Sequence, residues 1–139
     1  MKKFLGLDYG TTLIGVASGS SGIAFPRESF QNKGLQADVQ HVCDLVEELG
    51  VNKIVVGHPL RQLEDLPENQ VMAKVKKFVG ALEVALPDLE IVLFDERFST
   101  FEGEELMRDL REKGADTELS DDAFAAQVIL QRFFDKEGA

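Results

Sequence analysis

The chain has 139 residues, the length of one ordinary domain, and its hydrophobic content of 44% and charged content of 29% exclude a largely disordered protein. Its single cysteine excludes an internal disulfide, and because no apolar run is long enough to span a membrane, we expect one cytoplasmic domain over residues 1–139. The formal net charge of −10 argues against a broad DNA-wrapping surface, but it is compatible with a local basic patch.

The first part of the chain has the pattern of three closely spaced strands. Apolar segments alternate with short turns rich in glycine, serine and threonine, which predicts an antiparallel meander. Pro26 indicates an edge strand or a bulge, because proline has no N–H to donate to a neighbouring strand. The predicted strands cover residues 3–8, 13–18 and 23–30, and the predicted turns cover residues 10–12 and 19–22.

Helical and strand patterns alternate in the rest of the chain. An apolar stripe at helical spacing ends before Gly50, a stop signal, and Ser99 and Ser120 each stand where a helix cap is expected. The order of elements predicts an α/β protein with a mixed five-stranded sheet and helices on both faces, which is the order of the ribonuclease-H-like fold. The predicted helices cover residues 39–49, 67–86, 99–113 and 120–134, and the predicted strands cover residues 53–57 and 90–94.

Two acidic residues directly follow predicted buried strands. Asp8 ends the first strand, and Glu96 stands just past the last one. Ligands of open α/β sheets bind at the carboxyl ends of strands, so both positions are candidates for a functional site. The alternatives are that Asp8 accepts hydrogen bonds from turn amides, and that Arg97 pairs with one of the acids beside it.

A third acid opens the last predicted helix. Asp122 stands on a helical face whose later members are Ala126, Ile129 and Phe133, so its carboxylate continues a stripe predicted to pack against the sheet. The alternative is that acids in a first helical turn only stabilise the helix dipole, and Asp121 fits that role better.

Convergence of Asp8, Glu96 and Asp122 would need a counter-charge, because like charges held close together repel. A divalent cation provides one, and the hard oxygen ligands favour Mg²⁺ or Mn²⁺. Two such ions about 4 Å apart would activate water and stabilise the leaving oxygen in phosphodiester cleavage. Zinc is not expected, because His41 and His58 do not stand in ligand spacing with Cys43.

Four blocks of sequence carry a family resemblance. They are LGLDYGT with IGVA (residues 5–11 and 14–17), IVVG with Pro59-Leu60 (residues 54–57), DERFST (residues 95–100), and Asp122 followed by Ala125-Ala126 and ILQ (residues 129–131). In this order and over nearly the whole chain, they resemble the YqgF family, proteins described as Holliday-junction-resolvase-like and as pre-16S rRNA nucleases.

The resemblance implies a ribonuclease-H-like fold and Mg²⁺-dependent phosphodiester hydrolysis, with a role in maturing the 5′ end of 16S rRNA. It implies that Asp8, Glu96 and Asp122 are the catalytic acids and the metal ligands. RNA is therefore the expected nucleic-acid partner ahead of DNA, for a monomer or a homodimer.

Other residues near the acids are candidates for binding the substrate. The guanidinium of Arg97 suits a scissile phosphate, and the hydroxyls of Thr11 and Thr12 could orient water or phosphate. Turn formation is the alternative for the two threonines. The chain departs from the family where a basic residue usually follows the Gly-Thr turn, and residues 116–122 contain four acids and no base.

Three alternative functions follow from these features. The same fold could act as a non-catalytic nucleic-acid or ribosome-associated binding module, with the acids kept for metal binding and structure. A Holliday junction resolvase is the alternative nuclease and would normally need a dimer to cut two strands. Residues 8–12 also resemble the first phosphate loop of actin-like ATPases and sugar kinases, but a second, related domain is missing from this chain.

Overall fold

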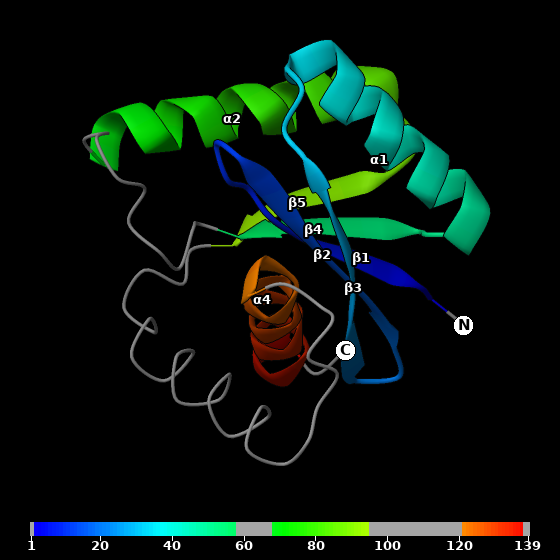
Figure 1. The fold of residues 1–139 in the computed structure, drawn as a ribbon. Coiled ribbons are helices and arrows are strands. Elements are labelled where there is room, and N and C mark those ends of the chain that lie inside the picture. Colours follow the sequence, from blue (N-terminus) through cyan, green and yellow to red (C-terminus); the bar gives the residue numbers. More distant parts are fainter. Residues whose placement is uncertain (1, 58–67, 95–120, 138–139) are drawn as a thin grey trace.

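The structure, a computed structural model, describes residues 2–57, 68–94 and 121–137 (Figure 1). The predicted helix at residues 99–113 lies outside these described residues, and the other predicted helices and strands are present. In chain order, the elements are β1 (Phe4–Asp8), β2 (Leu13–Ser20), β3 (Ile23–Gln31), α1 (Leu35–Leu49), β4 (Lys53–Gly57), α2 (Glu68–Ala85), β5 (Glu90–Phe94) and α4 (Asp121–Glu137).

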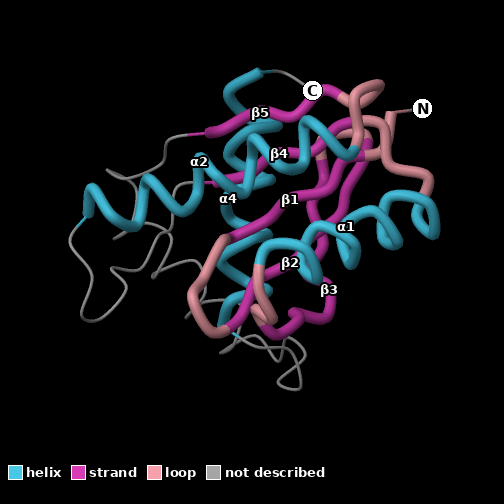
Figure 2. The backbone as a smooth tube through the Cα atoms, turned by 90° about the horizontal axis from the view of Figure 1, so that it is seen from above, coloured by secondary structure: helices cyan, strands magenta, loops and turns pink. Residues whose placement is uncertain are grey.

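The five strands form one mixed sheet in the order β3-β2-β1-β4-β5. β1, β2 and β3 pair antiparallel as the predicted meander, whereas β4 and β5 continue the sheet in parallel with β1. α4 covers one face of the sheet, and α1 and α2 cover the other (Figures 1 and 2). The predicted α/β class, mixed sheet and two-sided helical cover are confirmed.

The central strand β1 is buried along its whole length, as its continuous apolar run predicts. Successive side chains of a strand point to opposite faces. Phe4 accordingly joins the core under α4, whereas Leu5 and Leu7 join the core under α1 and α2. The remaining positions, Gly6 and Asp8, have the same parity as Phe4 and therefore belong to the α4 face.

The predicted turn at residues 19–22 is wrong in its extent. β2 continues to Ser20 and β3 begins at Ile23, so only Ser21 and Gly22 form the turn. Both have positive φ angles, 54° and 82°, as a type I′ hairpin turn requires. Gly19 is a strand residue, and a Cβ placed on it would lie 2.9 Å from the ring of Phe134.

The edge position of β3 agrees with the prediction made from Pro26. The register between β2 and β3 is irregular between Ile14, which pairs with Phe30, and Val16, which pairs with Arg27. β3 therefore contains one more residue than β2 over this interval, so the edge strand also has the predicted bulge, located just after the proline.

Helix α1 begins at Leu35, earlier than its apolar stripe indicated, and ends before Gly50, whose φ of 68° is left-handed as expected for a helix stop. In α4, the predicted stripe of Ala126, Ile129 and Phe133 is buried against the sheet. No helix in the described ranges is long and apolar enough to cross a membrane.

Candidate active site

Asp8 is the acid of the predicted triad whose side chain the structure describes. It ends the central strand, its relative exposure is 5%, and its parity places it on the face that α4 covers. Among the described residues, only Asp8 and Asp38 are both charged and buried. Ligands of open α/β sheets bind at the carboxyl ends of the strands, so the position of Asp8 at that edge points to a functional role.

Glycines flank Asp8 on both neighbouring strands. Its partner in the antiparallel ladder is Gly15, and its partner in the parallel ladder is Gly57. No side chain therefore extends beside the carboxylate from the directly opposite positions of β2 and β4. Sequence reasoning missed this arrangement, although both glycines belong to the motifs that suggested the family.

The glycines also let α4 pack close to the sheet. A Cβ on Gly57 would lie within 2.6 Å of Ile129 side-chain atoms, and a Cβ on Gly6 would lie 2.8 Å from the Cβ of Leu130 and 3.3 Å from the carbonyl oxygen of Ala126. Substitution at either glycine would therefore push the helix away from the strand end that carries Asp8.

Helix α4 runs in the opposite direction to β1. Its middle residues Ala126 and Leu130 lie over Gly6, whereas Phe134, nearer its C-terminus, packs edge-to-face on Phe4 with ring centroids 5.0 Å apart. The N-terminal turn of α4 is therefore directed toward the Asp8 end of β1. That turn contains Asp122, one helical turn before Ala126 on the same face.

The structure describes the predicted site residues to different extents. It describes Asp8 fully and places the backbone of Asp122 in the first turn of α4. Glu96 and Arg97 lie outside the described residues, so the convergence of the triad stays a prediction. Among the described residues, no group of three or more histidine, cysteine or acidic side chains could hold a metal.

The loop after Asp8 is fixed by Asn32, which follows β3. The Nδ2 of Asn32 donates to the carbonyl of Gly10 at 2.9 Å and to the hydroxyl of Tyr9 at 3.3 Å, and its backbone N–H donates to the carbonyl of Thr12 at 2.8 Å. The Tyr9 ring packs against Phe78 of α2, with ring centroids 5.3 Å apart. The loop is thus held by both a hydrogen-bond network and a ring contact.

A pocket of about 260 Å³ adjoins this loop. Thr11, a predicted substrate-binding residue, lines the pocket, whereas Thr12 is exposed without lining it. Two lysines of α2, Lys74 and Lys77, also line it and bring positive charge near the Asp8 end of β1. Sequence reasoning missed both lysines, although their exposed (i, i+3) spacing on a helix was available as a signal.

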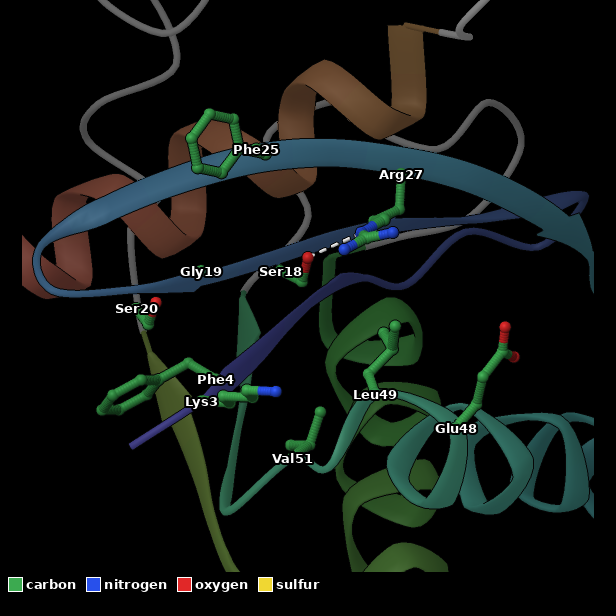
Figure 3. Close-up of a pocket in the computed structure, with 10 residues that line it drawn as sticks. All are labelled: Lys3, Phe4, Ser18, Gly19, Ser20, Phe25, Arg27, Glu48, Leu49 and Val51. Carbon is green, nitrogen blue, oxygen red and sulfur yellow. Dashed lines mark hydrogen bonds between the residues drawn. The ribbon is translucent and has the colours of Figure 1, made fainter. Parts of the chain in front are cut away.

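A larger pocket, of about 380 Å³, lies at the opposite end of β1 and is not part of this site (Figure 3). Phe4 lines it together with Glu48 near the end of α1, and Arg27 of β3, which also lines it, donates from Nε to the hydroxyl of Ser18 of β2 at 2.7 Å. Because Phe4 and Asp8 are the two ends of one strand, a ligand in this pocket would lie away from the Asp8 carboxylate.

Comparison with known proteins gives consistent matches over nearly the whole chain. The family model RuvX, described as Holliday junction resolvase, matches residues 2–136. A Fusobacterium nucleatum protein named "Putative pre-16S rRNA nuclease" is 34% identical over 97% of this chain and 98% of its own length. A Thermus thermophilus protein of the same name is 37% identical over 91% of this chain and 93% of its own length.

A solved structure has the same fold. It is T. thermophilus RuvC in complex with a Holliday junction substrate, which superposes with a TM-score of 0.67 at 17% sequence identity and covers 99% of this chain and 97% of its own. RuvC has a ribonuclease-H-like resolvase fold, so the fold predicted from the order of elements is confirmed.

Proposed function

Since the chain belongs to the RuvX family of Holliday junction resolvases, we propose that it is a metal-dependent nuclease whose catalytic acids are Asp8, Glu96 and Asp122. Membership of this nuclease family makes the chain a hydrolase of phosphodiester bonds. The observation that carries the residue assignment is the buried carboxylate of Asp8 at the end of the central strand, with the first turn of α4 directed toward it.

The donor set suits Mg²⁺ or Mn²⁺. Carboxylate oxygens are the hard ligands that these ions prefer, and the buried Asp8 carboxylate at the end of β1 is one such ligand. Asp8, Glu96 and Asp122 would hold the ions, which supply an activated water and stabilisation of the leaving oxygen. In this proposal Arg97 contacts the scissile phosphate with its planar guanidinium, and the hydroxyls of Thr11 and Thr12 orient water or phosphate beside it.

We propose the 5′ end of pre-16S rRNA as the substrate. We also propose that residues 1–139 form a single cytoplasmic domain. Two relatives above 30% identity that match nearly the full chain have names that refer to this RNA, which favours RNA over DNA.

A four-way DNA junction is the second candidate substrate. The description of the matching family and the junction bound to the RuvC structure favour it. Symmetric cleavage of two strands would require a homodimer, whereas maturation of one RNA end would need only a monomer. A protein that is a monomer during cleavage would therefore argue against the junction as its substrate.

The test is cleavage of a labelled RNA spanning the 5′ end of 16S rRNA, and of a four-way DNA junction, with Mg²⁺, with Mn²⁺ and with EDTA. We expect Asp8→Asn, Glu96→Gln and Asp122→Asn each to lower the cleavage rate about a hundredfold or more, the scale on which loss of one group of a catalytic unit acts. Asp121→Asn is the matched control, because it removes the neighbouring acid of the same helical turn, and we expect it to keep the activity.

Each other outcome has a definite meaning. Undiminished cleavage by Asp8→Asn would refute the assignment of the acids. Tight RNA binding with no cleavage under any metal condition would instead identify a non-catalytic binding module.

A further inference from the structure

We propose that the 260 Å³ pocket beside the Asp8 loop binds a backbone phosphate of the nucleic-acid strand that is being cut, with Lys74 and Lys77 as its cationic ligands. This pocket, called the lysine pocket below, combines residues of the loop after β1, the start of α1 and the outer side of α2. The inference rests on the proposed nuclease function and adds the place where the substrate backbone is held.

The charge of the lysine pocket favours an anion. Lys74 and Lys77 are exposed, stand three residues apart on α2, and form no ion pair with any residue in the described part of the chain. Two lysines one turn apart on a helix repel each other, and a bound phosphate would relieve that repulsion. In a chain with a net charge of −10, they supply the local basic patch that the overall composition does not.

One acid, Asp38, also lines the pocket, but its charge is compensated locally. Its side chain is 2% exposed, and its Oδ1 accepts a hydrogen bond from the backbone N–H of Lys33 at 2.9 Å. It stands in the first turn of α1, where the partial positive charge of a helix N-terminus stabilises an acid. The negative charge of Asp38 and the partial positive charge of the helix N-terminus therefore offset each other. The two lysines determine the sign of the charge in the pocket.

The loop that lines the pocket is held in place by hydrogen bonds and a ring contact. Asn32 fixes the loop through Gly10 and Tyr9, and Tyr9 is in turn packed on Phe78, the residue that follows Lys77 in α2. Thr11 belongs to this loop and adds an exposed hydroxyl to the pocket. A site whose walls are held in place before binding loses less conformational entropy when a phosphate enters.

The position of the pocket connects it to the cleavage site. Asp8 points to the α4 face of the sheet, whereas Tyr9, the next residue, packs on α2 at the other face. A nucleic-acid strand that crosses the sheet edge to reach Asp8 would therefore pass the lysine pocket, so a phosphate adjacent to the scissile one can be held there.

Binding measured without cleavage tests this inference separately from the proposed function. The probes are a fluorescein-labelled single-stranded RNA and a labelled four-way DNA junction, each titrated with full-length protein in EDTA at several salt concentrations. We expect Lys74→Gln and Lys77→Gln each to weaken binding about fivefold at ~0.1 M salt, and to reduce the slope of log K against log salt by about 0.7 for the RNA. Lys76→Gln is the matched control, since it removes one exposed lysine from the same helix outside the pocket, and we expect no change in the slope.

The results that would overturn the inference are distinct from those that would overturn nuclease activity. If the wild type cleaves RNA and the Lys74 and Lys77 variants bind and cleave like Lys76→Gln, the pocket assignment is wrong while the nuclease stands. If inorganic phosphate or ATP displaces the RNA from the wild type at the same micromolar concentrations as unlabelled RNA, the pocket is a small-anion site and the inference fails. Circular dichroism of each variant checks that the fold is retained.

Discussion

The side chain of Ile129 occupies the space above Gly57, the residue that pairs with Asp8 across the parallel ladder. Two of its carbons, Cγ1 and Cγ2, would lie 2.6 Å from a Cβ at that position. Because Gly57 has no side chain, it affects both the packing of α4 on the sheet and the environment of the Asp8 carboxylate.

Gly57→Ala should destabilise the protein, because the added methyl group must displace Ile129 and lift α4 from the sheet. Overpacking of this kind typically costs about 1–3 kcal/mol, measured as a lower free energy of unfolding in urea. Cleavage activity should also fall, because the helix that carries Asp122 moves.

Gly80→Ala is the control for that substitution. Gly80 is a helical glycine of α2, and a Cβ there would meet nothing within 4 Å. We expect it to stabilise the protein by about 0.5–1 kcal/mol, because alanine restricts the unfolded chain and favours helix. Equal effects of the two substitutions would show that the contact with Ile129 does not limit packing.

Gln131→Ala should weaken the attachment of the β2–β3 hairpin to α4. The Oε1 of Gln131 accepts from the N–H of Ala24 at 3.0 Å, and its Nε2 donates to the carbonyl of Gly22 at 2.8 Å. Loss of the side chain leaves these part-buried groups without partners, which costs about 1–3 kcal/mol in the free energy of unfolding.

The control for Gln131 is Gln40→Ala. Gln40 donates to Asp44 on the exposed side of α1 at 3.0 Å, so its loss should change stability by no more than about 0.5 kcal/mol. Hydrogen exchange of the Ala24 amide gives a local reading, and unchanged protection in Gln131→Ala would contradict the predicted role.

Ser21→Asn should stabilise the hairpin. Ser21 has a φ of 54°, and asparagine adopts that left-handed conformation more readily than serine. With Gly22 it would form the Asn-Gly pair that suits a type I′ turn, and we expect a gain of about 0.5 kcal/mol in thermal or urea unfolding. Ser20→Asn, at the last residue of β2, should give no such gain, and a gain there of the same size would mean that turn geometry is not the cause.

The thiol of Cys43 should react slowly. Burial raises the pKa of Cys43, and the neighbouring charge of Asp44 raises that pKa further. A raised pKa leaves less thiolate at a given pH, and the thiolate is the reactive form. The rate of reaction with a disulfide reagent should be below that of free cysteine at neutral pH and should continue to rise at pH values where free cysteine has levelled off.

Asp44→Asn tests the smaller of the two causes. Removal of the charge should lower the pKa of Cys43 and shift the rate profile toward lower pH, but not as far as that of free cysteine, because burial remains. A profile identical to that of free cysteine in the wild type would contradict the raised pKa.

The sheet was predictable from sequence because its strands are short apolar runs separated by turn residues. β4 and β5 have the predicted bounds, and β1 differs by one residue. Gly19 misled the prediction, because a glycine next to two serines looks like a turn, whereas here it makes room for the carbonyl of Ile23 and the ring of Phe134. The start of α1 was also missed, because its N-cap, Gly34, forms no side-chain cap that sequence could reveal.

The candidate site was predictable only in part. Asp8 could be found because the end of a buried strand is marked in the sequence by the first charge after an apolar run. The lysine pocket could not, because Thr11, Asn32 and Lys74 come from three separate segments and meet only after the sheet and α2 have packed. The places of Glu96 and Arg97 and the direction of the Asp122 side chain stay predictions.

Helix α4 follows all five strands in the chain, and this order has a consequence for how the protein folds during synthesis. The sheet face that bears Phe4, Ala17 and Val55 is buried by residues of α4. This face can therefore be covered only after residues 121–137 have been synthesised. Such late contacts slow folding and leave apolar surface exposed to other chains, which makes the nascent protein a candidate for chaperone protection. A nascent chain that has not yet reached α4 lacks Asp122, so it cannot assemble the proposed catalytic centre while it is still on the ribosome.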